Sequence, residues 1–550
     1  MIRIRDISLP PDGDMARLVQ AAARQLRISP NEIKQLDLKR RSVDARKKND
    51  VRIIYTVDVA VKGREDKILK MAHCARASLA QDPVYHVPQP RSIPAQRPVI
   101  VGFGPAGMFA ALVLSMAGLR PLVLERGQDA KARHAAVLEF WKTGTLDPEC
   151  NVQFGEGGAG TFSDGKLNTG VKNERIGWIL EQFAGAGASA DILYDAKPHI
   201  GTDELVTVVQ NLRETIIHYG GEVRFGVKVT GLVTEDGRVT GVRAAQGGEE
   251  AVIPASCVLL AIGHSARDTF EALHAQGVPM EPKPFSMGVR IEHPQRLVNE
   301  SQYGPFADAP GLGAADYKLN VRLPDGSSAY TFCMCPGGYV VAAASEEGGV
   351  VTNGMSDHAR DGENANAALL VTLNPADFPD RSPLGGMYWQ RQLEQTAFRA
   401  GGSNYRAPAQ LVGDFLARRP SQTLDGRGLS LGLKRRSIHI HPADVPPRRD
   451  ALRAAYRPAG ADHLRSGAGT AGAGPEAARL CRARRRPDRA GDAQLLARAH
   501  PPRRDPAVAA AGALPLRRGR GLCGGHHLRR AGRHSDGRGR DRSTERMKMR

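Results

Sequence analysis

The clearest hydrophobic pattern in this 550-residue chain is a short apolar run that is followed by glycines and then by a long apolar segment. Residues 99–101 are Val-Ile-Val, as in a parallel strand that is buried on both faces. Residues 105–118 are rich in apolar and small side chains and predict a helix, and residues 122–124 form a second apolar run that ends at Glu125. This order predicts a βαβ unit of a parallel sheet.

Residues 2–85 mix short strands and helices. A short strand at the N-terminus precedes a helix-like segment at 14–26, a strand at 50–59 and a second helix that starts at Asp66. This order predicts a small α+β module of the ferredoxin-like kind. Three prolines between positions 88 and 94 indicate a linker after the module.

Two later regions alternate apolar and polar residues in the way of antiparallel strands. Residues 221–229 and 239–243 predict two strands with a turn at Asp236-Gly237, and residues 258–262 predict a buried strand that ends at Gly263. Five further strands are expected at 287–291, 318–322, 329–333, 339–342 and 369–373. We therefore expect an antiparallel β-rich block after the parallel sheet.

The glycines after the first apolar run have the spacing that a bound pyrophosphate requires. Gly102 permits a tight turn, Gly104 lets N–H groups at the helix N-terminus approach a phosphate, and Gly107 lets the helix lie close to the sheet. Glu125, 23 residues after Gly102, stands where a carboxylate can accept hydrogen bonds from a ribose. Such a turn can also be purely structural, but strand, helix and acid all occur at the expected offsets. The segment therefore predicts a dinucleotide-binding site.

A second glycine cluster, at residues 151–167, is dense in small and hydrogen-bonding side chains. Its backbone can lie against a large flat ligand, although a flexible surface loop is the alternative. With the first motif, it makes the chain resemble bacterial FAD-dependent dehydrogenases of the type with two dinucleotide-binding domains. The resemblance implies that FAD is the cofactor. It also implies that the following residues bind it: Gly102, Gly104, Pro105, Ala106, Gly107, Glu125, Arg126, Gly158, Gly160, Thr161, Ser163, Asp164, Lys166, Val229 and Gly263.

The resemblance implies roles for the later segments and a domain order. The backbone near Val229 is expected to contact the adenine, the segment at Gly263 the nucleotide, and Lys166 the reduced flavin or only solvent. The implied fold is α/β: a Rossmann-like FAD-binding domain with an inserted antiparallel β-rich domain and a small N-terminal α+β module. We place the module at residues 1–88, the FAD-binding domain at 96–275 and the β-rich substrate domain at 276–420.

The β-rich block contains two pairs of side chains with possible chemical roles. Cys333 and Cys335 lie two residues apart on one strand face, a geometry poorly suited to a mutual disulfide, and we favour a backbone role over a redox pair. Arg290 and His293 can bind an anionic substrate or simply lie on a strand surface. The seven cysteines of the chain show no zinc spacing, so we expect no metal site.

Residues 353–356 (Asn-Gly-Met-Ser) are similar to a segment of the resembled family. Arg360 and Asn366 follow closely in the sequence. The resemblance implies that these residues line the same cleft as Arg290 and His293. We assign no catalytic residue from the sequence.

The formal net charge of +19 would ordinarily suggest a nucleic-acid partner, but the charge is concentrated near the C-terminus. Residues 441–550 contain 26 Lys and Arg against 10 Asp and Glu, whereas the first 440 residues contain 51 against 48. The segment 441–550 has no Ile, Phe, Trp or Asn, so it cannot readily build a packed core. It is either a basic disordered arm for RNA or a GC-rich coding sequence read in the wrong frame.

The genetic code favours the second interpretation. When each codon is read one nucleotide later, residues 513–526 can encode LYPCGEGAGYAGGI and residues 491–500 can encode ETRSSSPVRI. Both strings resemble C-terminal segments that complete the flavin pocket in the FAD-dependent family. We therefore expect a change of frame between about residues 419 and 440, and an out-of-frame, disordered basic tail over residues 436–550.

Together these features predict a cytoplasmic FAD-dependent oxidoreductase with a small-molecule substrate and an unidentified electron donor or acceptor, NAD(P)H being one candidate. No apolar run approaches the roughly 20 residues of a membrane span, so we expect no membrane partner. We also expect no nucleic-acid partner, because aromatic stacking residues are sparse beside the basic segments. Two alternatives stay open: a flavin-dependent RNA-modifying enzyme, and an inactive product that lacks the C-terminal flavin contacts.

Overall fold

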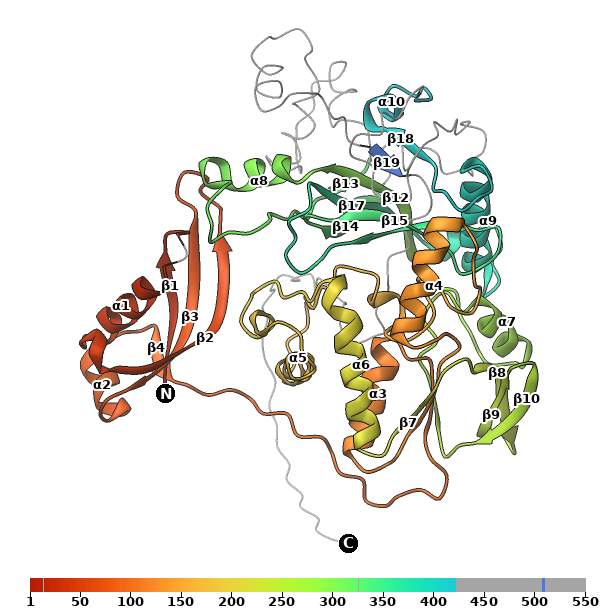
Figure 1. The fold of residues 1–550 in the computed structure, drawn as a ribbon, viewed down its shortest axis with the longest axis horizontal. Coiled ribbons are helices and arrows are strands. Elements are labelled where there is room, and N and C mark those ends of the chain that lie inside the picture. Colours follow the sequence, from red (N-terminus) through yellow and green to blue (C-terminus); the bar gives the residue numbers. More distant parts are fainter. Residues whose placement is uncertain (13, 325, 422–506, 510–550) are drawn as a thin grey trace, which may run out of the picture.

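The computed structural model of the protein describes residues 1–421 and 507–509, apart from positions 13 and 325. Figure 1 shows a small N-terminal module on one side, a parallel sheet with its helices, and a β-rich region above that sheet. The predicted change of frame and the predicted tail at 436–550 lie almost wholly outside the described residues. Within that tail the structure describes one short strand, β19 (Ala507–Ala509).

Six elements form the N-terminal module, in the order strand, helix, strand, strand, helix, strand. They are β1 (Ile2–Leu9), α1 (Met15–Leu26), β2 (Ile33–Asp44), β3 (Arg52–Val61), α2 (Glu65–Ala72) and β4 (Ala77–Leu79). The sheet has the order β2-β3-β1-β4 with antiparallel neighbours, which is the ferredoxin-like arrangement. The sequence pattern missed β2 because none of its residues is fully buried, which leaves its apolar alternation weak.

Apolar packing and an ion pair join this module to the rest of the chain. Leu18 of α1 belongs to the same buried cluster as Val298 of α8 (Gln295–Tyr303). On β2, the Arg41 guanidinium lies 2.6 Å from the Asp195 carboxylate. The module is therefore packed against its neighbours rather than held by the linker alone.

The region that follows the linker is built on a four-stranded parallel sheet. Its strands are β5 (Val99–Val101), β6 (Leu122–Leu124), β7 (Glu222–Arg224) and β11 (Val258–Leu260), in the order β11-β5-β6-β7. Helices α3 (Pro105–Met116) and α6 (Thr202–His218) pack on each other beside this sheet. The predicted strand, glycine turn, helix and strand at 99–125 are confirmed.

Alternate residues of the short strands enter two different cores. Ile100 and Val123 are fully buried in the cluster that contains the apolar side of α3 and α6. Val99 and Leu122 instead join a cluster with an antiparallel sheet on the opposite face. That sheet consists of β8 (Lys228–Glu235), β9 (Arg238–Gln246) and β10 (Glu249–Pro254). The parallel sheet is therefore covered on both faces, as its continuous apolar runs predict.

Two strand predictions need correction. The hairpin of β8 and β9 turns at Asp236-Gly237 as predicted, but residues 221–225 do not belong to it. They contain β7, which pairs in parallel with β6, because the chain crosses back through α6 before it reaches the hairpin. The strand before Gly263 is not buried either: it lies at the edge of the parallel sheet, and Leu260 is 43% exposed.

The β-rich region consists of one sheet, whose strands differ in length, and one hairpin. Its strands are β12 (Phe285–Pro294), β13 (Asn320–Arg322), β14 (Ser328–Cys335), β15 (Tyr339–Ala343), β16 (Val351–Met355), β17 (Asn364–Leu373) and β18 (Ala409–Leu411). The main sheet has the order β13-β14-β17-β12-β19-β18, and β15 pairs with β16. The five strands predicted between 283 and 374 are confirmed, with β16 in addition.

Further helices connect these sheets. They are α4 (Ala130–Thr143), α5 (Arg175–Gly185), α7 (Arg267–Ala275), α9 (Gly385–Ala400) and α10 (Val412–Leu416). In the part of the chain that the structure describes, no helix has the length and apolar content that crossing a bilayer requires.

Candidate functional site

The N-terminus of α3 forms an open mouth at the end of β5. Gly102 makes the turn with φ of 97°, and a Cβ placed on Gly107 would lie 1.9 Å from the Gly102 carbonyl oxygen. Only glycine therefore lets the helix lie this close to the strand. Pro105 and Ala106, the first two residues of the helix, are exposed. The first N–H groups of a helix have no acceptor within the helix, so this mouth can receive an anion.

The second glycine cluster lies directly against this mouth. A Cβ on Gly158, which has φ of 59°, would lie 2.9 Å from the Cα of Gly104. A Cβ on Gly160 would lie 3.6 Å from the Pro105 ring. Bare main chain from two segments about 50 residues apart thus meets at one place. The surface-loop interpretation of this cluster is wrong, because Phe154 and Phe162 within it are buried.

The buried side chain of Glu125 stabilises the contact between these two segments. Its carboxylate accepts hydrogen bonds from the backbone N–H groups of Phe103 at 2.7 Å, Gly127 at 2.9 Å and Gly155 at 2.9 Å. The side chain is 5% exposed and reaches the turn between β5 and α3. Each carboxylate oxygen can accept two hydrogen bonds, and Oε2 accepts one from the protein. Oε2 therefore keeps one unused acceptor position, and the ribose contact stays a prediction.

Arg133 of α4 organises the glycine loop and was missed by the sequence analysis. Its fully buried guanidinium donates to five backbone carbonyls, those of Asn151, Val152, Gly155, Glu156 and Gly158, at 2.7–3.4 Å. Burial lowers the pKa of Arg133 to about 10, so the side chain keeps its charge at neutral pH. A signal was present in the sequence: the buried face of α4 has helical spacing, and Arg133 stands at one of its core positions.

A second buried contact fixes the same loop to the helices. Glu156 is fully buried, and its Oε2 accepts from the Ala130 backbone N–H at 2.8 Å and from Arg213 at 3.0 Å. Burial raises the pKa of Glu156, against the opposing effects of these two donors. The loop is therefore held by Arg133, which donates hydrogen bonds to backbone carbonyls, and by Glu125 and Glu156, which accept hydrogen bonds from backbone N–H groups.

Arg126 lies in a network of four charges at the end of β6. It donates to Asp268 twice at 2.9 Å and to Glu149 at 2.6 Å, and its guanidinium lies 4.2 Å from the Phe154 ring centre. Lys228 completes the network through Asp268 at 2.6 Å and Glu149 at 3.0 Å. Burial opposes ionisation of Asp268, but the hydrogen bonds from Arg126 and Lys228 prevail and hold its pKa well below its usual range.

Further along the glycine cluster, Asp164 is the centre of a second charged group. Its carboxylate is 1% exposed and binds Lys166, the Ser356 hydroxyl and Arg360, the last through Nε at 3.0 Å and Nη2 at 2.5 Å. Burial opposes its ionisation, but the charges of Lys166 and Arg360 outweigh burial and lower the pKa of Asp164 to about 2. The glycine cluster is thus joined to the segment that follows β16.

A third group lies beside it in the main β-sheet. Arg290 of β12 is buried and donates from Nε to Asn366 Oδ1 at 2.6 Å and from Nη2 to the Cys333 carbonyl at 2.8 Å. Its Nη2 also lies 3.4 Å from Cys335 Sγ, and Lys166 Nζ lies 3.8 Å from the same sulfur. Arg290 and Asn366, which we expected in one cleft, therefore bond to each other, and Arg290 and Lys166 approach the same sulfur.

Other predicted site residues have structural surroundings. Thr161 donates to the Glu156 carbonyl, and Ser163 donates to the Gly160 carbonyl at 2.7 Å, so both shape the loop. Val229 is buried in the core between the two sheets, and Gly263 is exposed after β11 with φ of 72°. Their expected nucleotide contacts stay predictions.

His293 and the cysteine pair differ from the simplest expectation. His293 is buried, and its Nε2 lies 2.7 Å from the Tyr317 hydroxyl, so it is not a strand-surface residue. Cys333 and Cys335 do not share a regular strand face, because the register shifts between them and Cys333 has φ of 45°. Both thiols are free.

A pair of stacked histidines near Lys166 was also missed. The rings of His199 and His358 have centres 5.0 Å apart, and His199 forms a backbone bridge with Lys166. Burial lowers the pKa of His199, and the charge of Arg360 acts in the same direction. The two histidines are about 160 residues apart in the sequence, and no local sequence pattern predicts their contact.

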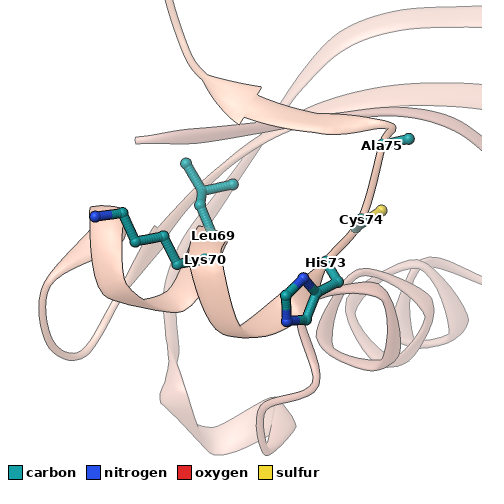
Figure 2. Close-up of a pocket in the computed structure, with 5 residues that line it drawn as sticks. All are labelled: Leu69, Lys70, His73, Cys74 and Ala75. Carbon is teal, nitrogen blue, oxygen red and sulfur yellow. The ribbon is translucent and has the colours of Figure 1, made fainter.

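A shallow depression on the N-terminal module is separate from these groups. Figure 2 shows the residues that line it, from Leu69 to Ala75, at the end of α2. It contains neither the glycine motifs nor the charged groups described above. We assign no ligand to it.

Comparison with known proteins gives the family. Residues 284–446 match a family described as FAD-dependent protein, C-terminal domain-like, and residues 1–60 match a domain of unknown function. The chain is 48% identical over 429 residues to an uncharacterized protein of Clostridium beijerinckii, which covers 77% of this chain and 79% of that protein. The chain belongs to this family of FAD-dependent proteins. FAD is its cofactor.

More distant relatives show partial similarity. The probable electron transfer flavoprotein-quinone oxidoreductase YdiS of Escherichia coli is 29% identical over 170 residues, or 30% of this chain and 36% of that protein. The crystal structure of Thermovibrio ammonificans THI4 covers 34% of this chain and 66% of its own, with 19% identity and a TM-score of 0.23. The structure of the flavin-dependent brominase Bmp2 covers 54% of this chain and 60% of its own, with 14% identity and a TM-score of 0.28. We draw no argument from structural similarity at this level.

Replacing Arg133 by Leu is expected to disorganise the glycine loop. Five buried carbonyls would lose their donor, so we expect a loss of more than about 3 kcal/mol in the free energy of unfolding. Thermal unfolding and hydrogen exchange of residues 151–160 measure this. Lys131→Met, an exposed change on the same helix, is the matched control. Equal protection of the loop in both variants would contradict the assigned role.

The Asp164 cluster is expected to weaken in acid. The pKa of Asp164 is lowered from 3.8 to about 2, so its charge stabilises the fold above about pH 4 and this contribution is lost as pH falls toward 2. The stability difference between the native protein and Asp164→Asn should therefore shrink between pH 4 and pH 2. Chemical denaturation of both proteins across this range measures the difference. A constant difference would show that Asp164 is not ionised in the fold.

Proposed function

We propose that the protein is a flavoprotein oxidoreductase that moves electrons between a small-molecule substrate and a second electron partner. The observation that carries the proposal is the double main-chain cradle, in which Gly158 lies against Gly104 at the open N-terminus of α3. When bound, FAD supplies the group that accepts and releases electrons. The family membership supports the cofactor, and the relative named as a flavoprotein oxidoreductase supports the reaction class.

The residues present fit this cofactor. The backbone N–H groups at the start of α3 and the helix dipole favour a pyrophosphate at the mouth. The free acceptor position on Glu125 Oε2 suits a ribose hydroxyl, while a 2′-phosphate would be repelled by this carboxylate. Because Gly104 and Gly158 have no side chains, the main chain can approach the ligand from both sides.

We propose that the Lys166 ammonium stabilises negative charge on the reduced flavin. Its Nζ is held by Asp164 and lies 3.8 Å from Cys335 Sγ, so the ammonium has a fixed place at the end of the glycine cluster. A fixed cation stabilises negative charge that develops next to it. The charges of Cys335 and Asp164 raise the pKa of Lys166 against the opposing effect of its burial, so it stays protonated at neutral pH.

The remaining partners and the cellular location are proposed from the sequence. A small-molecule substrate and an electron donor or acceptor such as NAD(P)H are required by the reaction class. We propose a cytoplasmic protein with no nucleic-acid partner, since the basic excess falls on residues 441–550. We assign the chain to the flavoprotein type with two dinucleotide-binding domains on its motifs alone.

We also propose that the C-terminal part of this product is read out of frame. Support comes from the Arg-rich composition of residues 441–550 and from the two alternative-frame strings. The family match ends at residue 446, close to the start of this segment. Sequencing the coding DNA across codons 419–440 tests the hypothesis. A verified DNA sequence without a change of frame, together with the same Arg-rich segment in related proteins, would contradict it.

FAD binding is expected to depend on the absence of a side chain at residue 158. Gly158→Val would place atoms within 2.9 Å of the Gly104 Cα, so the purified variant should lose at least 10-fold in affinity for FAD. Gly170→Val, where no atom lies within 4 Å, is the matched control. Flavin absorbance and fluorescence titration measure the affinity, with the full chain and with a frame-corrected chain. A corrected chain that binds no FAD would overturn the proposed function.

Replacing Lys166 by Met is expected to lower the midpoint potential of the bound flavin. Loss of the fixed positive charge should cost about 30 mV or more, which for a two-electron couple is about 1.4 kcal/mol. Lys172→Met, an exposed change in the same segment, should leave the potential unchanged. Anaerobic titration with a reference dye measures both values. Equal potentials would show that Lys166 does not act on the flavin.

A further inference from the structure

Asn366 has a buried hydrogen-bond donor with nothing to bind. The residue lies on β17, is fully buried, and its Oδ1 accepts from Arg290 Nε at 2.6 Å. Because Arg290 Nε is only a donor, the amide oxygen must face it, which fixes the orientation of the amide. The Nδ2 group then has no partner among the described residues. A buried unpaired donor of this kind points to a missing acceptor.

Arg290, next to it, is a buried cation that pairs with no carboxylate of the described residues. Its hydrogen bonds go to Asn366, to the Cys333 carbonyl and to Cys335 Sγ, and none of these groups is a carboxylate. The side chain is 3% exposed, and Arg267, which is also deeply buried, pairs with Glu394 at 2.6 Å. Burying a guanidinium without an anion is costly, and Arg290 does not have the five carbonyl partners that Arg133 has. An anionic ligand would supply the missing partner.

The surrounding charges leave a small positive excess. Lys166 and Arg360 share the single carboxylate of Asp164, and Glu292 follows Arg290 by two residues on β12. Two cations therefore share one carboxylate, and Arg290 lies beside them, because its Nη2 and the Lys166 Nζ approach the same Cys335 sulfur. An anionic ligand would offset this positive excess.

The exposed atoms of the group belong to Lys166 and Arg360. The side chain of Lys166 is 23% exposed and that of Arg360 is 14% exposed. Gly354 packs against the buried pair, because a Cβ there would lie 2.0 Å from Arg290 Nη2 and 2.3 Å from Asn366 Oδ1. Lys166 belongs to the glycine cluster that we assign to FAD, so we expect a ligand to approach from this side.

We propose that Arg290 and Asn366 bind the carboxylate of an anionic substrate. One carboxylate oxygen would accept from Asn366 Nδ2, and the charge would be balanced by the Arg290 guanidinium. The inference rests on the proposed function, since it names the substrate class of that flavin site. It also accounts for an arginine, an asparagine and a glycine that pack together without a structural partner for the amide.

The experiment compares carboxylates with uncharged amides of the same shape. The full FAD-loaded chain is titrated with benzoate and with benzamide at constant ionic strength, and binding is followed by the change in flavin absorbance and by ligand-observed NMR. Benzoate should bind at least 10-fold more tightly than benzamide. Equal binding of the two compounds, or binding of neither to a chain that holds FAD, would overturn the inference. Equal binding would be the result if the Asn366 amide takes only a water molecule.

Two substitutions keep the test independent of folding. Asn366→Leu removes the donor and should weaken benzoate binding at least 10-fold. Asn366→Asp keeps the shape and gives Arg290 a carboxylate partner, so it should fold at least as stably while it abolishes benzoate binding. Arg322→Met, an exposed change on β13 of the same sheet, is the matched control and should bind benzoate normally. Normal benzoate binding by Asn366→Asp would overturn the inference.

The result is separable from the cofactor assignment. A frame-corrected chain that retains no FAD would overturn the proposed function, and NMR with benzoate on the FAD-free chain would still report on the carboxylate site. A chain that retains FAD but does not distinguish benzoate from benzamide would overturn only this inference.

Discussion

The buried guanidinium of Arg133 is the interaction on which the nucleotide-binding half depends. An irregular, glycine-rich loop has no strand or helix partner for its carbonyl groups, and buried carbonyls need donors. Arg133 supplies donors to five of them at once. Glu125 does the converse for three backbone amides of the same region. One cation and one anion thereby fix main chain that has no regular structure of its own.

The placement of this loop decides what the helix mouth can do. With the loop fixed, Gly158 lies against Gly104, and two stretches of bare backbone border the same space. A glycine turn by itself is common, because glycine is used wherever a turn needs positive φ. The second backbone surface distinguishes this mouth from an ordinary turn between a strand and a helix.

Charge joins the nucleotide-binding half to the β-rich half. Asp164 at the end of the glycine cluster binds Arg360 and Ser356, which follow β16, and Lys166 reaches the sulfur of Cys335 on β14. These contacts place the polar face of the antiparallel sheet beside the glycine cluster. The charged groups beside the glycine cluster therefore come from both halves.

The sequence by itself determined the βαβ unit, the glycine mouth with Glu125, the β8–β9 turn and the antiparallel strands after residue 283. These features follow from local rules: two-residue alternation, continuous apolar runs and glycine at fixed offsets are all visible within a short window. Only the tertiary structure decided that residues 222–224 pair in parallel with β6 and that Arg133 donates hydrogen bonds to the loop carbonyls. It also decided that Arg290, which bonds to Asn366, lies near Lys166. Strand pairing and buried polar contacts join residues tens to hundreds of positions apart, so their partners are set by the packing of the whole chain and leave no local pattern to read.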